Sequence, residues 1–409
     1  MNILQNYPNP QELLNWYASL KKDNLYKVNG HIHTPFSFSA FTDIAQIFEM
    51  AKKENIKVLG INDFYVTDGY SFFYEQALKD SIFPLFNIEF IGLLKEEQAN
   101  HIHINDPNNP GRCYFSGKGL NYPFKLSNDL LTKLNAVIKE SQVQVQGMID
   151  KTNQWFAEIN IGIKLDFNAI KKKFAKELIR ERHIAKAIRF AVYEKASSEA
   201  DRKTLLQKIY GGKDTKVNIN DVNALENEIR GNLLKAGGKA FVEEDEKAFM
   251  SIDEIIKIIQ AAGGIPCYPV LLDDKNGHYT EYEANKENLY EELTKRNIGC
   301  IELIPGRNDF NHLKNFVKFF YEKGFIINFG TEHNTPDMIP LTCDTRGNKP
   351  LDEELNKISY EGACIIAAHQ YLRTKGIPSF INESGKPENA RKDYFIQLGK
   401  AVIEKFLTK

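Results

Sequence analysis

The sequence contains no long apolar run. No stretch approaches the roughly 18 consecutive apolar residues that a membrane-spanning helix requires, and the first residues, MNILQNYPNPQELL, lack a basic segment followed by an apolar one. We therefore expect a cytoplasmic protein without a membrane partner. Net charge is almost absent as well, because 53 Lys and Arg offset 54 Asp and Glu. Without a global positive field, the chain is not expected to bind nucleic acid.

Paired cysteine spacing is absent too. The five cysteines are scattered and none stands in a CxxC pattern: Cys113, Cys267, Cys300, Cys343 and Cys364. This distribution favours free buried thiols in a reducing compartment over disulfides or a zinc knuckle. The chain has no internal repeat and no low-complexity tract. Its length of 409 residues suggests two or more structural units, and 42% hydrophobic residues allow a large core.

Short apolar runs alternate with amphipathic segments at both ends of the chain, after a leading helix at 10–24. This rhythm predicts a parallel sheet covered or closed by helices. The middle of the chain is instead Lys-rich and helical, so we divide it into residues 1–105, a helical insertion at 106–250, and residues 251–409. The strands are expected at 28–33, 57–62, 84–90, 101–104, 265–271, 299–304 and 325–330.

Polar residues capable of binding a metal stand at the ends of several expected strands. His31 and His33 in GHIHT point to the same face of a strand, because alternate side chains of a strand share a face. Glu89 interrupts the apolar run FPLFNIEFIGLL. Glu332 stands in GTEH, at the end of another apolar strand. A buried charge is costly unless it is paired or ligated, so this pattern predicts a metal site at the carboxyl ends of the strands.

Further polar residues end expected strands without a defined role. They are Asp63, His101, His103, Tyr268, Asp273, Glu302 and His333. Asp63 is expected to orient its neighbours, and His101 competes with His103 for any role in binding. The alternative for the histidines and glutamates is a former metal site that now holds a water-filled polar network.

Seven segments resemble, in order and approximate spacing, a known family. NGHIHTPFS, LGINDFYVTDG, FNIEF, HIHIN, RERHIAKAI, AAGGIPCYP and NFGTEHN follow the pattern of the polymerase and histidinol phosphatase (PHP) family of metal-dependent phosphoesterases. The resemblance covers about residues 28–335. It implies an α/β fold: a distorted seven-stranded β/α barrel of the PHP type, similar to a TIM barrel, with an inserted helical subdomain.

The resemblance also implies which residues bind metal. The family's first site corresponds to His31, His33, Glu89 and Glu332, where Glu332 stands in place of the usual Asp. The second site keeps His103, but Tyr268 replaces a ligand. The third site is lost, with Phe38, Phe64 and Asn334 at its positions. We therefore expect one or two divalent transition-metal ions, namely zinc, manganese or iron.

The implied activity is hydrolysis by a metal-bound hydroxide, with a phosphorylated small molecule or nucleotide as substrate. His333 and Asp63 are the candidate catalytic residues. The resemblance places Arg182 and His183 near the phosphate, where a guanidinium could bind it as a fork, although both lie on a basic helix that could simply be solvated. Arg307 and Tyr268 are further candidates for substrate binding.

Two other functions remain open from the sequence. A PHP-fold binding protein that has lost catalysis could use Phe38 and Phe64 to line an apolar ligand pocket. A metal-dependent hydrolase acting on a bond other than a phosphate ester could work with a single ion.

Overall fold

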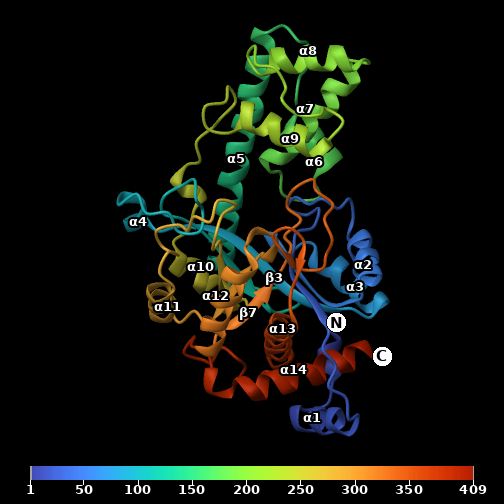
Figure 1. The fold of residues 1–409 in the computed structure, drawn as a ribbon, viewed down its shortest axis with the longest axis vertical. Coiled ribbons are helices and arrows are strands. Elements are labelled where there is room, and N and C mark those ends of the chain that lie inside the picture. The colour runs from blue at the N-terminus through green and yellow to red at the C-terminus, as the bar shows by residue number, and fades with distance from the viewer. Residues whose placement is uncertain (1, 409) are drawn as a thin grey trace.

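Seven strands form one sheet that curls into a nearly closed barrel (Figure 1). They follow one another around the barrel in chain order: β1 (Lys27–Ile32), β2 (Ile56–Phe64), β3 (Phe83–Leu93), β4 (Arg112–Lys118), β5 (Ile265–Val270), β6 (Cys300–Leu303) and β7 (Ile326–Phe329). Neighbouring strands are parallel except β4, which is antiparallel to both β3 and β5. An isolated bridge between Ile32 and Glu332 joins the segment after β7 to β1. The expected α/β barrel is confirmed.

The helices outside the insertion pack around the barrel or on one another in the computed structural model, which describes residues 2–408. They are η1 (Ile3–Asn6), α1 (Pro10–Ser19), α2 (Ile44–Lys53), α3 (Tyr70–Asp80), α4 (Lys95–Ala99), η3 (Glu246–Ala248), α10 (Ile252–Ala261), α11 (Lys286–Lys295), η4 (Pro305–Arg307), α12 (Phe310–Glu322), α13 (Glu353–Thr374), η5 (Asn389–Arg391) and α14 (Lys392–Leu407). A small hairpin, β8 (Asp344–Thr345) and β9 (Lys349–Pro350), precedes α13. Within residues 2–408 no helix has the length and apolar character needed to cross a bilayer.

The strand expected at 101–104 does not form, and that prediction was wrong. This segment is a turn that begins at His101 with a positive φ of 56°. The fourth strand is instead β4, inside the range 106–250 that we had assigned to the helical insertion. Its register pairs Arg112 with Leu93, so the chain must reverse between β3 and β4. Residues 94–111 supply that reversal and cannot extend the sheet themselves.

The helical insertion follows β4 and has a hydrophobic core of its own. Its elements are α5 (Asn128–Glu158), α6 (Phe167–Phe174), α7 (Glu181–Lys195), α8 (Glu199–Ile209), α9 (Val222–Ile229) and η2 (Arg230–Leu234). Leu134 and Val137 on the first half of α5 belong to the barrel core, whereas Met148 and Phe156 on its second half belong to the insertion core. The long helix α5 therefore ties the insertion to the barrel (Figure 1).

Close packing of the two C-terminal helices, one on the barrel and the other on the first, requires a glycine at each contact. A Cβ at Gly362 of α13 would lie 1.9 Å from the carbonyl oxygen of Ile327 in β7. A Cβ at Gly399 of α14 would lie 1.9 Å from the carbonyl oxygen of Cys364 in α13. Both obstacles are backbone atoms, so a side chain could be accommodated only if the helices moved apart.

We predict that Gly399→Ala lowers the free energy of unfolding by about 3 kcal/mol, because it forces α14 away from α13. Chemical denaturation with urea measures this change. Gly231→Ala is the matched control, because no atom lies within 4 Å of a Cβ at Gly231. Equal stability of the two variants would contradict the close helix approach.

Candidate metal centre

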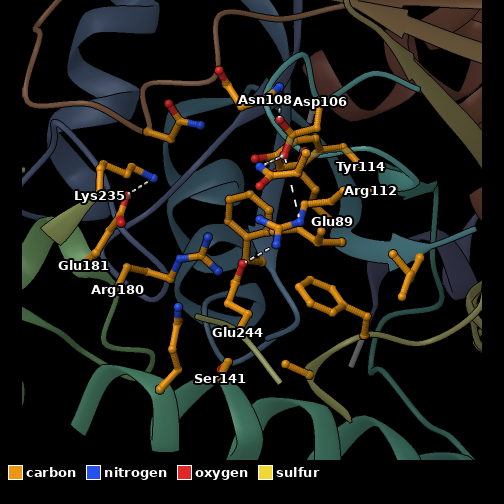
Figure 2. A pocket seen from close by; sticks show the side chains of 18 of the residues that line it. Glu89, Asp106, Asn108, Arg112, Tyr114, Ser141, Arg180, Glu181, Lys235 and Glu244 are labelled. Carbon is orange, nitrogen blue, oxygen red and sulfur yellow. Dashed lines mark hydrogen bonds and ion pairs between the residues drawn. The ribbon is translucent and has the colours of Figure 1, made fainter. Parts of the chain in front are cut away.

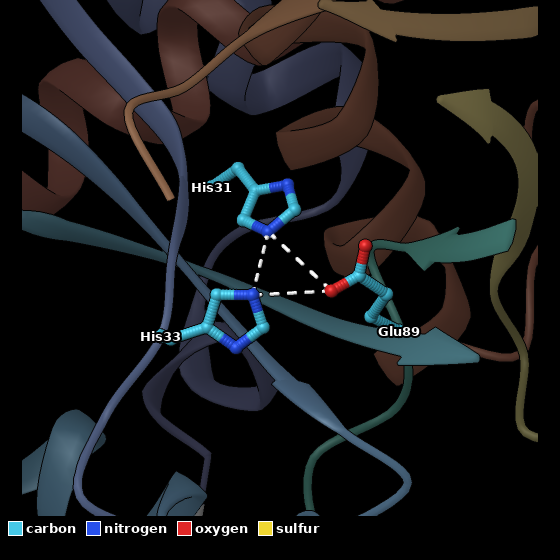
Figure 3. A group of neighbouring side chains, drawn as sticks. All are labelled: His31, His33 and Glu89. Carbon is cyan, nitrogen blue, oxygen red and sulfur yellow. Dashed lines mark hydrogen bonds and ion pairs between the residues drawn. The ribbon is translucent and has the colours of Figure 1, made fainter. Parts of the chain in front are cut away.

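Three buried side chains from β1 and β3 converge at the carboxyl end of the barrel. His31 is the second-last residue of β1, His33 is the first residue after the strand, and Glu89 lies in β3. One possible ligand atom from each of these residues lies within 4.8 Å of the others, and no other such group is found in residues 2–408. Figure 3 shows both imidazoles and the carboxylate turned toward one point.

The hydrogen-bond partners of the two imidazoles assign the tautomer of each. Nδ1 of His31 lies 2.9 Å from Oε2 of Glu302, which can only accept a hydrogen bond when ionised. Nδ1 of His33 lies 3.2 Å from the hydroxyl oxygen of Ser37, and that hydroxyl donates to Asp63 at 2.6 Å. Both Nδ1 atoms therefore carry the proton, and both Nε2 atoms present a lone pair.

These lone pairs face each other without a donor between them. The two Nε2 atoms are 3.2 Å apart, and Oε2 of Glu89 lies 3.1 Å from Nε2 of His33 and 3.9 Å from Nε2 of His31. Oε2 of Glu89 is buried and has no hydrogen-bond partner. Native proteins rarely bury acceptors unsatisfied, so the arrangement favours a proton or a cation between these atoms.

The charge states of these groups favour a cation at this point. Burial lowers the pKa of His33 to about 4, which keeps its imidazole neutral at pH 7. Burial raises the pKa of Glu89 to about 8, so in the absence of a cation its carboxyl group retains a proton. A single proton can satisfy only one of the three contacts, whereas one divalent ion can contact all three groups. Two imidazole nitrogens and one carboxylate suit zinc, manganese or iron.

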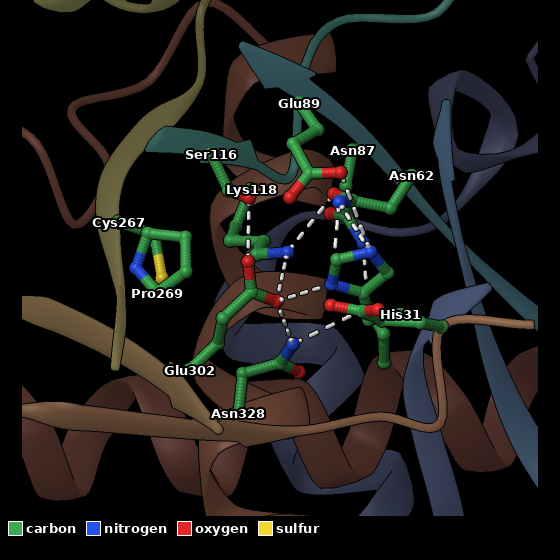
Figure 4. Close-up of polar contacts among 12 residues, drawn as sticks. His31, Asn62, Asn87, Glu89, Ser116, Lys118, Cys267, Pro269, Glu302 and Asn328 are labelled. Carbon is green, nitrogen blue, oxygen red and sulfur yellow. Dashed lines mark hydrogen bonds and ion pairs between the residues drawn. The ribbon is translucent and has the colours of Figure 1, made fainter. Parts of the chain in front are cut away.

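Glu302 supports His31 from behind through a fully buried network (Figure 4). Its Oε2 accepts from Lys118 at 2.5 Å and from Asn328 at 3.3 Å, and its Oε1 accepts from Ser116 at 2.5 Å. Burial by itself would raise the pKa of Glu302, but the Lys118 ammonium and His31 outweigh it and hold this pKa well below its usual range. The carboxylate therefore remains ionised and fixes the Nδ1–H tautomer of His31.

Asn62 connects Lys118 to the face of the His31 ring. Its amide oxygen accepts from Lys118 at 2.9 Å, and its amide nitrogen lies 3.0 Å from Nε2 and 3.3 Å from Nδ1 of His31. The two ring nitrogens point in divergent directions, so a group at nearly equal distances from both lies over the ring. Asn62 therefore leaves the in-plane lone pair of Nε2 free.

Asp63, a predicted catalytic residue, is occupied with orienting its neighbours. Its carboxylate accepts from the backbone N–H of Thr34 at 2.7 Å, from the Thr34 hydroxyl at 2.5 Å and from Ser37. Through Ser37 it fixes the orientation of His33. A direct part for Asp63 in catalysis stays a prediction.

Glu332 lies beside the three-residue group but its carboxylate is paired with Arg307. Its backbone oxygen accepts from the N–H of His33 at 2.7 Å, which places it at the same edge of the barrel. Burial raises the pKa of Glu332, but Arg307, His31 and His33 together lower it below the usual value. Its role as a ligand stays a prediction.

His333, the other predicted catalytic residue, has both ring nitrogens engaged. Nδ1 lies 2.9 Å from the Thr331 hydroxyl and Nε2 donates to the carbonyl oxygen of Ile339 at 2.9 Å. Its ring stacks on Phe41 with the centroids 4.9 Å apart. These contacts hold the loop after β7 in place.

Two other predicted residues lie away from the three-residue group. His103 is partly exposed and pairs with Glu281 at 3.0 Å. Tyr268 is buried and its hydroxyl donates to Glu283 at 2.9 Å, so it does not face the opening. Neither residue is brought close to Glu89, and their predicted roles in metal and substrate binding have no support from this geometry.

A cavity of about 1070 Å³ lies between the barrel opening and the insertion (Figure 2). Glu89, Phe64 and Arg307 line its barrel side, and Arg180 and Arg182 line its insertion side. His183 is buried beside it: its Nδ1 accepts from the backbone N–H of Arg180 at 2.9 Å, and its ring edge meets Phe38. His183 therefore shapes the start of α7 and is not aimed into the cavity.

Arg180 reaches the metal-binding group through Phe64, and sequence reasoning missed it. Its guanidinium carbon lies 4.4 Å from the centre of the Phe64 ring, and that ring stacks on His33 with the centroids 4.9 Å apart. No carboxylate within residues 2–408 forms an ion pair with it. Arg182 instead donates to the amide oxygen of Asn227 at 3.2 Å. Arg180 is the first residue of the RERH motif that contains Arg182 and His183, so this motif was the signal in the sequence that could have identified Arg180.

Lys118 was also missed, and Glu302 had no assigned role. Glu302 stands in the apolar run IGCIELIP, where a charge is costly, and that cost was the signal available for it. Lys118 ends the mixed segment RCYFSGK, which gives no such signal. The role of each residue depends on the pairing of two strands that are distant along the chain.

Comparisons with known proteins identify a solved structure with a similar fold. The sequence matches no protein-family model, and no curated protein matches it significantly. Among solved structures, a protein from Bifidobacterium adolescentis described as a metal-dependent phosphoesterase is similar with a TM-score of 0.52 and 13% identity, over 81% of this chain and 95% of that one. An amidohydrolase from Chromobacterium violaceum, with bound sulfate and no metal, has a TM-score of 0.48 and 17% identity, over 81% of this chain and 96% of that one. The first likeness shows a shared fold.

We predict that Glu302→Gln weakens the binding of zinc or manganese by about 10- to 100-fold, because His31 loses the anionic partner that fixes its tautomer and raises its basicity. Titration calorimetry measures the affinity. The variant also leaves Lys118 unpaired, so the double variant Glu302→Gln with Lys118→Met is measured beside it to separate folding from metal binding.

Glu404→Gln is the matched control for Glu302→Gln. Glu404 is buried and accepts from Tyr26 at 2.6 Å, but it lies on α14, away from the three-residue group. This control should bind metal like the unmodified protein. Unchanged metal affinity in both Glu302 variants would contradict the support assigned to Glu302.

Proposed function

We propose that this protein is a metal-dependent hydrolase of the PHP type that acts on a phosphate ester of a small molecule in the cytoplasm. The observation that carries the proposal is the convergence of two Nε2 lone pairs and an unpartnered carboxylate oxygen at one buried point. The likeness in fold to a protein described as a metal-dependent phosphoesterase is consistent with it. Zinc, manganese and iron are the proposed cofactors, and the ligands are His31, His33 and Glu89.

A divalent ion held there would act as a Lewis acid on a phosphoryl oxygen and would activate water. The residues around it have separate tasks. Glu302 and Ser37 hold the two imidazoles with Nε2 toward the ion. Glu89 supplies the negative charge. Arg180, which lacks a carboxylate partner and lies over Phe64, is positioned to bind the phosphate of the substrate as a fork.

Phe38 and Phe64 both line the cavity, and their other sides are packed against neighbouring side chains. Phe64 is packed between His33 and the guanidinium of Arg180, and Phe38 receives the edge of His183. Both are nearly fully buried by these contacts. They serve as a packed support between the metal-binding group and the insertion.

We predict that His33→Ala and Glu89→Gln each lose the bound metal and with it any phosphate-ester hydrolysis, because each removes one of three ligands. Elemental analysis of purified protein measures the metal, and hydrolysis of p-nitrophenyl phosphate with added manganese measures activity. His278→Ala is the control, because His278 is exposed in the loop after β5. A full metal content in either ligand variant would contradict the assigned site.

We further predict that Arg180→Gln raises the KM for p-nitrophenyl phosphate by about tenfold or more, since it removes a charge-assisted fork to the phosphate. Metal content should stay unchanged, because Arg180 touches Phe64 and not a ligand atom. Arg202→Gln is the matched control, as Arg202 also lies over an aromatic ring, Tyr193, but within the insertion. A KM that is unchanged in Arg180→Gln would remove this residue from the site.

A further inference from the structure

The charged side chains around the cavity are sorted by sign. The insertion wall carries Arg180, Arg182, Arg230 and Lys235 with a single carboxylate, Glu181. The opposite wall carries Asp106, Glu243, Glu244 and Glu246 with a single arginine, Arg112. A neutral protein has no general reason to gather like charges on facing walls of one cavity. The two walls therefore need separate explanations.

The acidic wall is satisfied by its own partners. Arg112 pairs with Glu244 at 2.7 Å and lies 4.0 Å from Asp106, which also accepts from the backbone N–H of Asn108 at 2.9 Å. Glu246 and Glu243 are exposed to solvent, and Glu246 pairs with Lys95. This wall has no need of a ligand.

The basic wall is not balanced in the same way. Glu181 is shared between Arg230 and Lys235, with Lys235 at 2.8 Å. Arg230 also donates to the amide oxygen of Asn227 at 3.1 Å, and Arg182 donates to the same oxygen at 3.2 Å without pairing with a carboxylate. Burial, and then Arg230, lowers the pKa of Arg182 to about 10, so it stays charged at neutral pH. Figure 2 shows Arg180, Glu181 and Lys235 on the same side of the cavity.

The N-terminus of α7 adds to this positive potential. The helix starts at Glu181, directly after Arg180, and the first turn carries Arg182. The partial positive charge of a helix N-terminus favours an anion near these residues. Backbone and side chains therefore act in the same direction on this wall.

The size of the cavity shows that more than a phosphate group can fit. Its volume of about 1070 Å³ is at the upper end of sites that enclose whole small molecules. Glu89 lies on the barrel side of its lining, and Arg180, Arg230 and Lys235 lie on the insertion side. A substrate whose reacting phosphate lies at Glu89 would extend along the insertion wall.

We propose that the insertion wall formed by Arg182, Arg230 and Lys235 binds a second anionic group of the substrate. This inference rests on the proposed function and names its substrate class: phosphate esters whose alcohol part carries a second phosphate or a carboxylate. Arg180 contacts the reacting phosphate beside the metal, and the other three cations select the second anion.

The test compares probes that differ only in the second anion. The probes are alkanediol bisphosphates of increasing chain length and the monophosphates of the same diols, and calorimetry measures their binding to the manganese-loaded full-length protein. We expect the bisphosphate of suitable length to bind about tenfold tighter or more than its monophosphate. Equal affinities across the whole series would overturn the proposal.

The variants assign the effect to the insertion wall. The double variant Arg182→Gln with Lys235→Gln should reduce the ratio of bisphosphate to monophosphate affinity to about 1, because it removes two of the three cations. Arg112→Gln is the matched control on the opposite wall and should keep the ratio of the unmodified protein. A ratio unchanged in the double variant would also overturn the proposal.

The same measurements separate this inference from the proposed function. Monophosphate binding and p-nitrophenyl phosphate turnover without any advantage for bisphosphates would leave the hydrolase standing and reject the second anion site. Absence of binding by either series, together with absence of turnover, would contradict both. Tight bisphosphate binding without turnover would support the second anion site and reject the hydrolase.

Discussion

The structure depends on one electrostatic constraint: two imidazole lone pairs and an oxygen of the Glu89 carboxyl group are held close together, almost fully buried, at one end of a barrel. The two Nε2 atoms are 3.2 Å apart, and the carboxylate of Glu89 lies 3.1 Å from one of them. Three acceptor atoms that converge at one buried point form a group that could hold a metal ion.

Keeping those acceptors in place requires a second layer of buried charge. Lys118 and Glu302 form an ion pair with almost no exposure to solvent, and such a pair is stabilising only if its remaining hydrogen bonds are satisfied. Ser116 and Asn328 satisfy Glu302, and Asn62 satisfies Lys118. Because the pair is neutral overall, it can orient His31 without cancelling the charge of an ion on the other side of the ring.

Two phenylalanines join the barrel to the insertion. Phe64 packs under the guanidinium of Arg180, and Phe38 packs against His183. Both contacts are made to the start of α7 and the residue before it. The insertion also contributes to the cavity, because the first turn of α7 lines the cavity together with Glu89.

The sequence by itself determined the alternation of strands and helices, because period-two and period-3.6 patterns depend on neighbouring residues alone. It also marked His31, His33 and Glu89, since charged or imidazole groups in apolar strands are costly wherever the strands lie. Only the tertiary structure decided that β4 lies at 112–118, that Glu302 and Lys118 support His31, and that Arg180 and not Arg182 lies over Phe64. Each of these depends on which distant segments meet when the barrel closes, and no local pattern encodes that pairing.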